Sequence, residues 1–193
     1  SYGFDASIEY YLDNGSLFSA AAFMRNVDNV IYADDSTIDA GAFINEYAGE
    51  QWTYTGFLNG SDGKFSGVEL NTVFFADDLI EGVGISANVT FTDSEFKQAN
   101  GETVGLPGTS DLIYNAAIFY EDYGISARLN YSWRDKWISP IEDPAEFWGE
   151  MERLDAQISY TFPSQISGSE VSVYAYFNNL TDDTDVRYAG NGT

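Results

Sequence analysis

Hydrophobic and polar residues alternate along several segments of the chain, most cleanly over residues 83–96 and 125–134. In the second of these, Ile125, Ala127, Leu129, Tyr131 and Trp133 alternate with Ser126, Arg128, Asn130, Ser132 and Arg134. A period of two places these sets on opposite faces of a β-strand. Another strand-like segment, residues 111–120, comes before it, with Gly124 in the tight turn between them. The stretch from Asp111 to Trp137 therefore predicts a β-hairpin.

The same pattern predicts eight antiparallel strands joined in chain order. They cover about residues 4–12, 17–32, 52–75 (interrupted at 59–63), 83–96, 111–120, 125–137, 152–162 and 170–178. Short turns at Asn14, Asp78, Asp122 and Ser167 alternate with long loops at Ala33–Glu50, Lys97–Ser110 and Ser139–Gly149. Because antiparallel neighbours reverse direction, every second connection lies at the same end of a sheet. We therefore expect the long loops at one end and the short turns at the other.

The alternation fits two architectures, a soluble sandwich with a dry core and an outer-membrane barrel with a lipid-facing side and a wet lumen. The aromatic residues distinguish between them. Rings lie beside the short turns at Tyr10, Tyr11, Phe74, Phe75, Phe119, Tyr120, Tyr160 and Phe162, and near the long loops at Trp52, Trp133, Trp137 and Trp148. Two such bands are typical of the interfacial girdles of membrane proteins, although rings also favour strand ends in soluble proteins.

The barrel interpretation assigns each strand residue to lipid or lumen. We expect Ile85, Val89, Leu129, Ala156 and Ile158 to face lipid at mid-membrane depth. The lumen face is expected to carry Glu69, Asn71, Asn88, Arg128, Asn130, Asp155 and Gln157. Burying such groups unpaired in a dry core is costly, which favours a wet lumen, although a soluble sandwich could show them to bulk water. We expect Arg128 to pair with a wall carboxylate such as Asp155.

Composition excludes several functions. The chain has 193 residues, with 31 Asp and Glu against 8 Lys and Arg, and a formal charge of −23. Such a surface repels phosphate, so no nucleic-acid partner is expected. There is no Cys and no His, which excludes a disulfide scaffold, Cys/His zinc ligation and catalysis by Cys or His. We expect no enzymatic activity and no cofactor.

Two kinds of residue are candidates for ligand binding. The acidic groups Asp34-Asp35 and Asp182-Asp183-Thr184-Asp185 offer oxygen ligands for calcium, but neither matches a glycine-punctuated calcium loop. We interpret them as solvated loops and predict neither a metal site nor a catalytic residue. Aromatic side chains near the long loops offer stacking surface for a sugar or an aryl siderophore. The candidate ligand contacts are Trp52, Tyr54, Arg134, Trp137 and Trp148, with packing within loops as the alternative role for the rings.

Several short motifs resemble those of TonB-dependent outer-membrane receptors. Lys64-Phe65-Ser66-Gly67-Val68-Glu69-Leu70 resembles a barrel strand of that family. Leu106-Pro107-Gly108-Thr109-Ser110, followed by Tyr114-Asn115 and Ala127-Arg128-Leu129-Asn130-Tyr131, is similar to the hairpin that precedes the end of such barrels. Asn178-Asn179-Leu180-Thr181-Asp182 resembles the segment before their last strand. Each motif is short, and their order and spacing over residues 64–182 strengthen the match.

The resemblance implies an all-β, antiparallel, up-and-down transmembrane barrel of about 22 strands that encloses an N-terminal plug. Such receptors lie in the outer membrane of Gram-negative bacteria and import scarce ligands with energy passed through TonB. This sequence contains no plug, no TonB box and no terminal aromatic strand. We therefore expect residues 1–193 to form about eight strands of the C-terminal part of the barrel, with TonB contacted through the missing N-terminal part.

The expected partners are outer-membrane lipid and a small-molecule ligand whose identity, a siderophore, a sugar or a similar compound, stays open. Two other hypotheses remain at this point. One is a passive porin-type barrel, and the other is a soluble acidic β-sandwich that binds carbohydrate.

Overall fold

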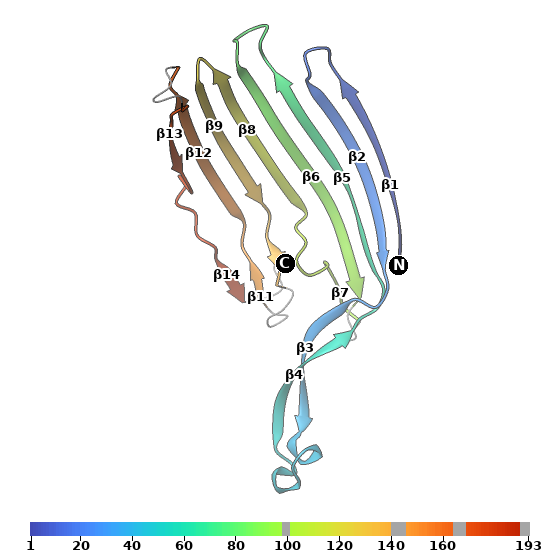
Figure 1. The fold of residues 1–193 in the computed structure, drawn as a ribbon. Helices are drawn as coiled ribbons and strands as arrows, with labels where there is room; N and C mark the ends of the chain where they lie inside the picture. Colours follow the sequence, from blue (N-terminus) through green and yellow to red (C-terminus); the bar gives the residue numbers. More distant parts are fainter. Residues whose placement is uncertain (98–100, 140–145, 164–168, 190–193) are drawn as a thin grey trace.

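The computed structural model describes residues 1–97, 101–139, 146–163 and 169–189. Most of the chain forms one open antiparallel sheet, a single curved layer of tilted strands (Figure 1). Its strands, in spatial order, are β1 (Tyr2–Tyr11), β2 (Leu17–Val27), β5 (Gly63–Phe75), β6 (Val83–Lys97), β8 (Leu112–Asp122), β9 (Ile125–Arg134), β12 (Met151–Thr161) and β13 (Ser172–Phe177). The short β7 (Thr103–Val104) pairs with the end of β6. The predicted all-β, antiparallel, up-and-down segment is confirmed, and the sheet does not close into a barrel.

The short turns lie at one end of the sheet and the long connections at the other, as predicted (Figure 1). The turn between β8 and β9 shows the local cause. Tyr123 and Gly124 have φ angles of 51° and 75°, and two successive positive values are typical of the two-residue turn that matches strand twist. The predicted turn at Ser167 lies outside the described residues.

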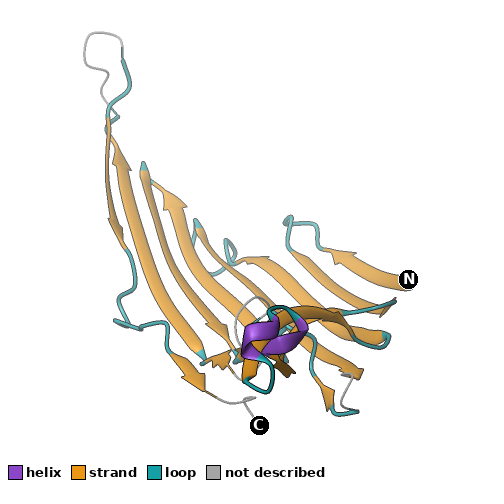
Figure 2. Cartoon of the chain, turned by 90° about the horizontal axis from the view of Figure 1, so that it is seen from below, coloured by secondary structure: helices purple, strands orange, loops and turns teal. Residues whose placement is uncertain are grey.

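The chain between β2 and β5 differs from the prediction. It forms β3 (Ile31–Asp39) and β4 (Gln51–Asn59), a separate hairpin with two 3₁₀ turns at its tip, η1 (Ala40–Ala42) and η2 (Asn45–Tyr47). The predicted strand over 17–32 ends early, at Val27, and the predicted loop Ala33–Glu50 contains most of β3. The predicted interruption at 59–63 is confirmed by the break between β4 and β5, but the two parts of the predicted strand over 52–75 lie in different sheets. The hairpin projects away from the long-loop end of the main sheet (Figures 1 and 2).

Local backbone and a small core explain this departure. Asn29 has a φ angle of 55°, which bends the chain after β2, and its N–H donates to Asp62 Oδ1 at 3.3 Å. Val30, Tyr32 and Phe96 are buried together at the base of the hairpin, with the rings of Tyr32 and Phe96 5.5 Å apart. Since Phe96 belongs to β6, this contact is invisible to a local hydrophobic pattern.

A third sheet forms from segments expected to be loops. It joins β10 (Trp137–Ile138), β11 (Glu146–Trp148) and β14 (Arg187–Ala189) in that order. The predicted loop Ser139–Gly149 therefore contains a strand, with residues 140–145 outside the described part, and the predicted strand over 125–137 ends at Arg134. Each strand here has at most three residues, too few for an alternation to be recognised.

In the described part of the chain, neither face of the main sheet packs against a second layer. Its apolar side chains remain open, with Ile85, Leu129 and Ile158 exposed by 44%, 40% and 48%. A dry-core sandwich would bury them, so the soluble sandwich loses its main support. Across the described residues, no helix has the length and hydropathy needed to cross a membrane.

Candidate functional site

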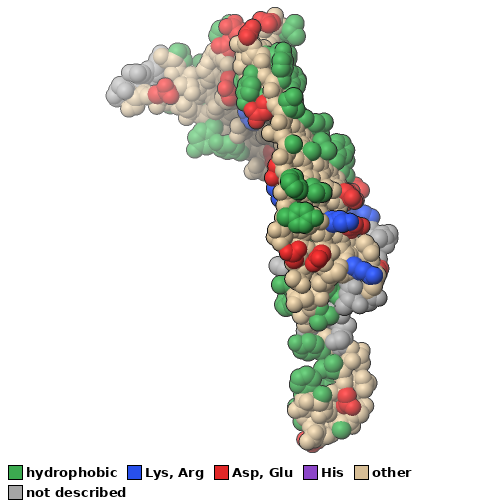
Figure 3. Space-filling view, turned by 90° about the vertical axis from the view of Figure 1, so that its right-hand side faces the viewer, with side chains coloured by type: hydrophobic (Ala, Val, Ile, Leu, Met, Phe, Trp, Pro, Cys, Tyr) green, Lys and Arg blue, Asp and Glu red, His purple; other side chains and the backbone are tan. Residues whose placement is uncertain are grey.

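Cross-strand register divides the main sheet into an apolar face and a polar face, because residues directly opposite in an antiparallel pair share a side. One row of the apolar face runs across six strands as Ile8, Ala20, Leu70, Val89, Tyr114 and Trp133. A second row contains Phe74, Ile85, Ile118, Leu129, Ala156 and Phe177. Figure 3 shows hydrophobic side chains standing out along the length of the sheet. All five residues expected to face lipid lie on this apolar face.

The polar face carries the seven side chains assigned to the lumen by the sequence pattern. Register pairs Glu69 with Thr90, Asn71 with Asn88, Arg128 with Gln157, and Asn130 with Asp155. Asn88 also lies opposite Asn115, whose Nδ2 donates to its Oδ1 at 2.9 Å. The polar face thus carries amides, hydroxyls and charges on neighbouring strands.

The expected pair between Arg128 and Asp155 is not formed. Arg128 instead lies over the ring of Phe119, 5.0 Å from its centroid, and Asp155 Oδ1 accepts from the Asn179 N–H at 2.7 Å. The correction has a geometric cause. Phe119 covers Gly84 on the adjacent strand, where an added Cβ would lie 2.2 Å from its Cζ. The ring therefore lies flat on the polar face and offers a cation–π partner to Arg128.

The Gly-Val-Glu motif also has a steric explanation. Gly67 lies opposite Phe23 on one neighbouring strand and Thr92 on the other. A Cβ at Gly67 would lie 2.3 Å from the Phe91 backbone oxygen and 2.5 Å from Phe23 Cζ. Any larger residue here forces backbone apart, and Glu69, two positions later, remains on the same face.

Four side chains at the long-loop end form what we call the arginine–tryptophan stack. Arg134 Cζ lies 3.8 Å from the Trp137 ring centroid, and the Trp137 and Trp148 rings are 5.7 Å apart with planes 8° from parallel. Arg187 Cζ lies 4.3 Å from the Trp148 ring centroid. The pairing of Trp137 with Trp148 and of Trp148 with Arg187 in the third sheet sets this order. Stacked rings between two cations form a rigid planar surface.

Arg134 also holds the segment Leu106–Ser110 against the sheet. Its Nε donates to Ser110 Oγ at 2.7 Å and its Nη2 to the Gly108 carbonyl at 2.9 Å. Ser94 Oγ accepts from the Leu106 N–H at 3.1 Å. Because Arg134 and Ser94 both belong to the polar face, the segment lies over that face. The guanidinium therefore supports the loop as well as the stack.

Between this segment and β1, β2, β5 and β6 lies a groove of about 480 Å³, the polar-face groove. Its walls include Phe23, Arg25, Phe65, Glu69, Thr90 and Thr92. Both Asp5 carboxylate oxygens accept from Arg25 Nη2 at 2.7 Å, so the guanidinium is already paired. Glu69 makes no hydrogen bond or ion pair within the described residues. The groove thus offers a carboxylate, hydroxyls and the Phe23–Phe65 ring pair, whose centroids are 5.1 Å apart.

The five residues predicted to contact ligand are divided by the structure. Arg134, Trp137 and Trp148 come together in the stack. Trp52 and Tyr54 lie on β4 in the projecting hairpin, exposed by 39% and 53%. Trp52 packs on Tyr47 at 5.3 Å between centroids, and its Nε1 donates to Glu50 Oε2 at 3.3 Å.

Sequence reasoning missed Arg187 and the role of the Asn-Leu-Thr-Asp segment. Asn179 Oδ1 accepts from the Asp183 N–H at 3.1 Å, and its Nδ2 donates to the Asp183 carbonyl at 2.9 Å. Asp183 Oδ2 accepts from the Glu152 N–H at 2.8 Å. Asn179 and Asp182 have φ angles of 53° and 54°, which Asn and Asp tolerate better than most residues. The motif is a turn that fastens the tail to the start of β12.

Replacing Asn179 by Ala should lower the free energy of unfolding by about 1–3 kcal/mol, because it leaves the turn's polar groups unpaired. The measurement is urea unfolding of the full-length receptor in detergent. Asn178→Ala is the matched control, since Asn178 is exposed and makes no hydrogen bond within the described residues. Equal losses in both variants would contradict the turn's role.

Asp39 organises the tip of the projecting hairpin. Its Oδ1 accepts from the Gly41 N–H at 2.8 Å and the Gly49 N–H at 3.0 Å. These two backbone hydrogen bonds lower the pKa of Asp39 below its ordinary value of 3.8, and the bond from Gly41 has the larger effect. Since a lowered carboxyl pKa favours the folded state once the group is ionised, this stabilisation is present above pH 3.8 and lost as pH falls through the lower, folded value.

We therefore expect the Gly41 and Gly49 amides to exchange faster, relative to their intrinsic rates, as the pH is lowered through the folded pKa of Asp39. Hydrogen exchange of the full-length receptor measures this. Asp39→Asn keeps an accepting oxygen but cannot titrate, so its protection should not change over the same range. A pH dependence retained in Asp39→Asn would show that another group is responsible.

Over the described residues, no group of three or more Asp and Glu is arranged to hold an ion. Asp34 and Asp35 belong to strand β3, not to the loop that was predicted, and Asp183 is engaged by the turn described above.

A one-layer sheet with one apolar face, one polar face and long connections at one end defines a segment of an outer-membrane β-barrel wall. The comparison with known families agrees. The family described as TonB dependent receptor-like, beta-barrel, matches residues 1–180. The chain belongs to this family, a family of transporters, and membership implies the outer membrane of a Gram-negative bacterium. No curated protein matched the chain significantly.

Proposed function

We propose that this chain forms part of the barrel wall of a receptor that imports a small ligand into the periplasm, driven by TonB acting through another part of the protein. The observation that carries the proposal is the separation of the main sheet into one apolar and one polar face. In this proposal the apolar face contacts lipid. The polar face, including Glu69, Asn71, Asn88, Arg128, Asn130, Asp155 and Gln157, lines the lumen.

We further propose that the ligand first contacts the arginine–tryptophan stack and then the polar-face groove. Both lie toward the long-loop end, and connecting loops often carry recognition. Glu69 and the hydroxyls of Thr90 and Thr92 favour a ligand rich in hydrogen-bond donors. Because Arg25 is already paired with Asp5, that part of the groove has no free cation, and this disfavours an anionic ligand. These features support a sugar over an anionic ferric siderophore.

Uptake by cells that express the full-length receptor tests the proposal. Neutral radiolabelled trisaccharides and a ferric tricatecholate serve as probes, with and without functional TonB. We expect TonB-dependent accumulation of at least one trisaccharide, reduced at least tenfold by Trp148→Ala. Trp52→Ala, on the separate hairpin, is the control and should retain most uptake. TonB-independent entry would support a passive pore instead, and accumulation of the tricatecholate alone would reject the sugar assignment.

A further inference from the structure

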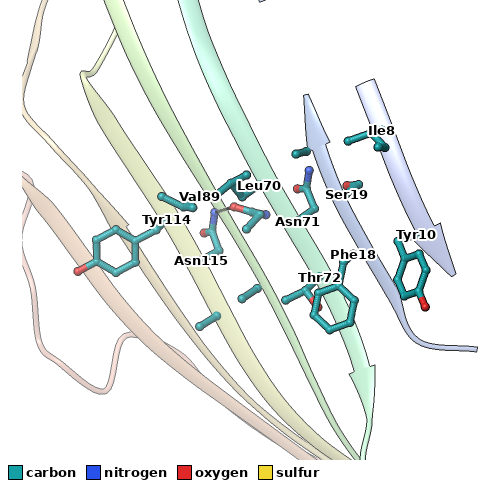
Figure 4. Close-up of a pocket in the computed structure, with 14 residues that line it drawn as sticks. Ile8, Tyr10, Phe18, Ser19, Leu70, Asn71, Thr72, Val89, Tyr114 and Asn115 are labelled. Atoms are coloured by element: carbon teal, nitrogen blue, oxygen red, sulfur yellow. Dashed lines mark hydrogen bonds between the residues drawn. The ribbon is translucent and has the colours of Figure 1, made fainter. Parts of the chain in front are cut away.

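A groove of about 770 Å³ crosses the apolar face obliquely, from the short-turn end of β1 toward the middle of β6 and the long-loop end of β8. In Figure 4 the rings of Tyr10 and Phe18 stand at one end, Tyr114 stands at the other, and Leu70 and Val89 lie between them along one side. No charged residue is among those that line the groove. The groove belongs to the outer side of the wall, away from the stack and the polar-face groove.

The sequence makes this groove through a local change in side-chain size. Thr72, Ala87 and Ala116 lie side by side on three neighbouring strands, and the same row begins with Tyr10 and Phe18 and continues to Tyr131. The row on one side of it contains Leu70, Val89 and Tyr114, and the row on the other contains Phe74, Ile85 and Ile118. Three small residues enclosed by larger ones leave a depression that the protein itself does not fill.

The groove runs obliquely from the membrane interface into the hydrocarbon. Tyr10 lies one residue before the end of β1, beside the short turn. Ala116 lies four residues from Tyr120, or about 13 Å along the strand. Tyr10 belongs to the aromatic band at the short-turn end, where rings mark the headgroup level. If the apolar face meets lipid, as the proposed function has it, one end of the groove is thus at headgroup depth and the rest is bordered by hydrocarbon.

The charges around the interfacial end indicate which headgroup fits. The turns after β1, β5 and β8 carry Asp13, Asp77, Asp78, Glu81, Glu121 and Asp122, and their sequences, residues 11–17, 75–83 and 119–126, contain no Lys or Arg. The first two turns are adjacent, since Asn14 Nδ2 donates to the Phe75 carbonyl at 3.1 Å. Asp13, Asp78 and Glu81 are exposed. An acidic rim repels anionic lipids and attracts a headgroup with a primary ammonium.

From depth, lining and charge together, we propose that the groove seats an acyl chain of one ethanolamine phospholipid from the leaflet at the short-turn end. The chain lies over Thr72, Ala87 and Ala116, and the ammonium group lies toward Asp13, Asp78 and Glu81. A phosphatidylglycerol headgroup lacks the ammonium and adds a negative charge against this rim. A choline headgroup carries its charge without hydrogen-bond donors, so it cannot donate to the carboxylates.

Native mass spectrometry of the full-length receptor tests the proposal. The receptor is taken from nanodiscs with equal amounts of phosphatidylethanolamine, phosphatidylglycerol and phosphatidylcholine. We expect one retained lipid, with phosphatidylethanolamine at least fivefold enriched. Ala87→Trp fills the floor and should reduce retention at least fivefold. Ala127→Trp, on the same face but outside the lining, should leave it unchanged.

A second variant tests the headgroup separately. Asp13→Asn combined with Asp78→Asn and Glu81→Gln should keep a lipid in the groove but abolish the preference for ethanolamine. If Ala87→Trp fails to assemble, Ala116→Leu is used in its place. Assembly is judged by the change in electrophoretic mobility that the folded receptor shows when the sample is not heated. Preference for phosphatidylglycerol, equal retention in the filled and control variants, or a second copy of the chain bound in place of lipid would each overturn the proposal.

Discussion

Replacing Leu129 by Arg is expected to destabilise the membrane-inserted receptor by about 2–4 kcal/mol, the cost of a cation on the lipid side near the bilayer midplane. Leu129 lies at the middle of β9, between Ile118 and Ala156 on the apolar face, and is 40% exposed. No carboxylate lies directly opposite it, so the guanidinium must either stay in hydrocarbon or distort the strand to reach water.

The adjacent residue provides the matched control. Asn130 has the same depth but lies on the polar face, opposite Asp155. Asn130→Arg should therefore cost less than about 1 kcal/mol, because the new cation meets a wet, acidic surface. Urea unfolding of the full-length receptor in lipid vesicles compares the two variants. Equal losses would contradict the assignment of the apolar face to lipid.

Replacing Arg134 by Ala should release the segment Leu106–Ser110 and break the arginine–tryptophan stack at its first member. The substitution removes two hydrogen bonds from a charged donor, to Ser110 and Gly108, and the contact with Trp137. Hydrogen bonds to charged groups contribute about 1.5–3 kcal/mol each, and a cation–π contact about 0.5–2. Because Arg134 is partly exposed, we expect a net loss of about 2–3 kcal/mol, toward the low end of these values.

Hydrogen exchange at Gly108, whose N–H donates to the Ile138 carbonyl at 2.8 Å, reports on this segment. Its protection should fall at least tenfold in Arg134→Ala. Arg134→Lys should recover only part of the protection, since an ammonium lacks the planar fork that spans both acceptors. Arg153→Ala is the control, because Arg153 lies on the polar face of β12 and makes no hydrogen bond within the described residues. Unchanged protection in Arg134→Ala would show that the other hydrogen bonds of the segment, to Ser94, Asp135 and Ile138, are enough to hold it.

The two predictions test different parts of the proposed receptor. The Leu129 prediction tests whether the apolar face of the sheet meets lipid and the polar face meets water. The Arg134 prediction tests whether this side chain supports the candidate ligand site. A loss of trisaccharide uptake in Arg134→Ala with normal assembly would connect the arginine–tryptophan stack and its support of the segment Leu106–Ser110 to recognition. The same loss with failed assembly would indicate only a structural role.

The sequence by itself determined the sheet and its two faces. Alternation in β6, β9 and β12 fixed which residues lie together, because side chains of an extended strand point to opposite sides whatever its neighbours are. The turn at Gly124 was readable for a similar reason, since a tight turn depends on the backbone preferences of two residues. In β2, by contrast, the Ala20–Ala22 segment is small on both sides, and only its register with β5 assigned its faces.

The tertiary structure decided the contacts between distant segments. Phe96 of β6 packs with Val30 and Tyr32, so the chain leaves the sheet after Val27 although its hydrophobic pattern continues to Tyr32. Arg187 joins Trp148 through β14, a three-residue strand whose sequence carries no periodic signal. The partner of Arg128 was likewise decided by Phe119, which lies over a glycine on the next strand. Local patterns fix which way a side chain points, but which distant groups meet depends on strand register and chain path, and these are set by the energy of the whole assembly.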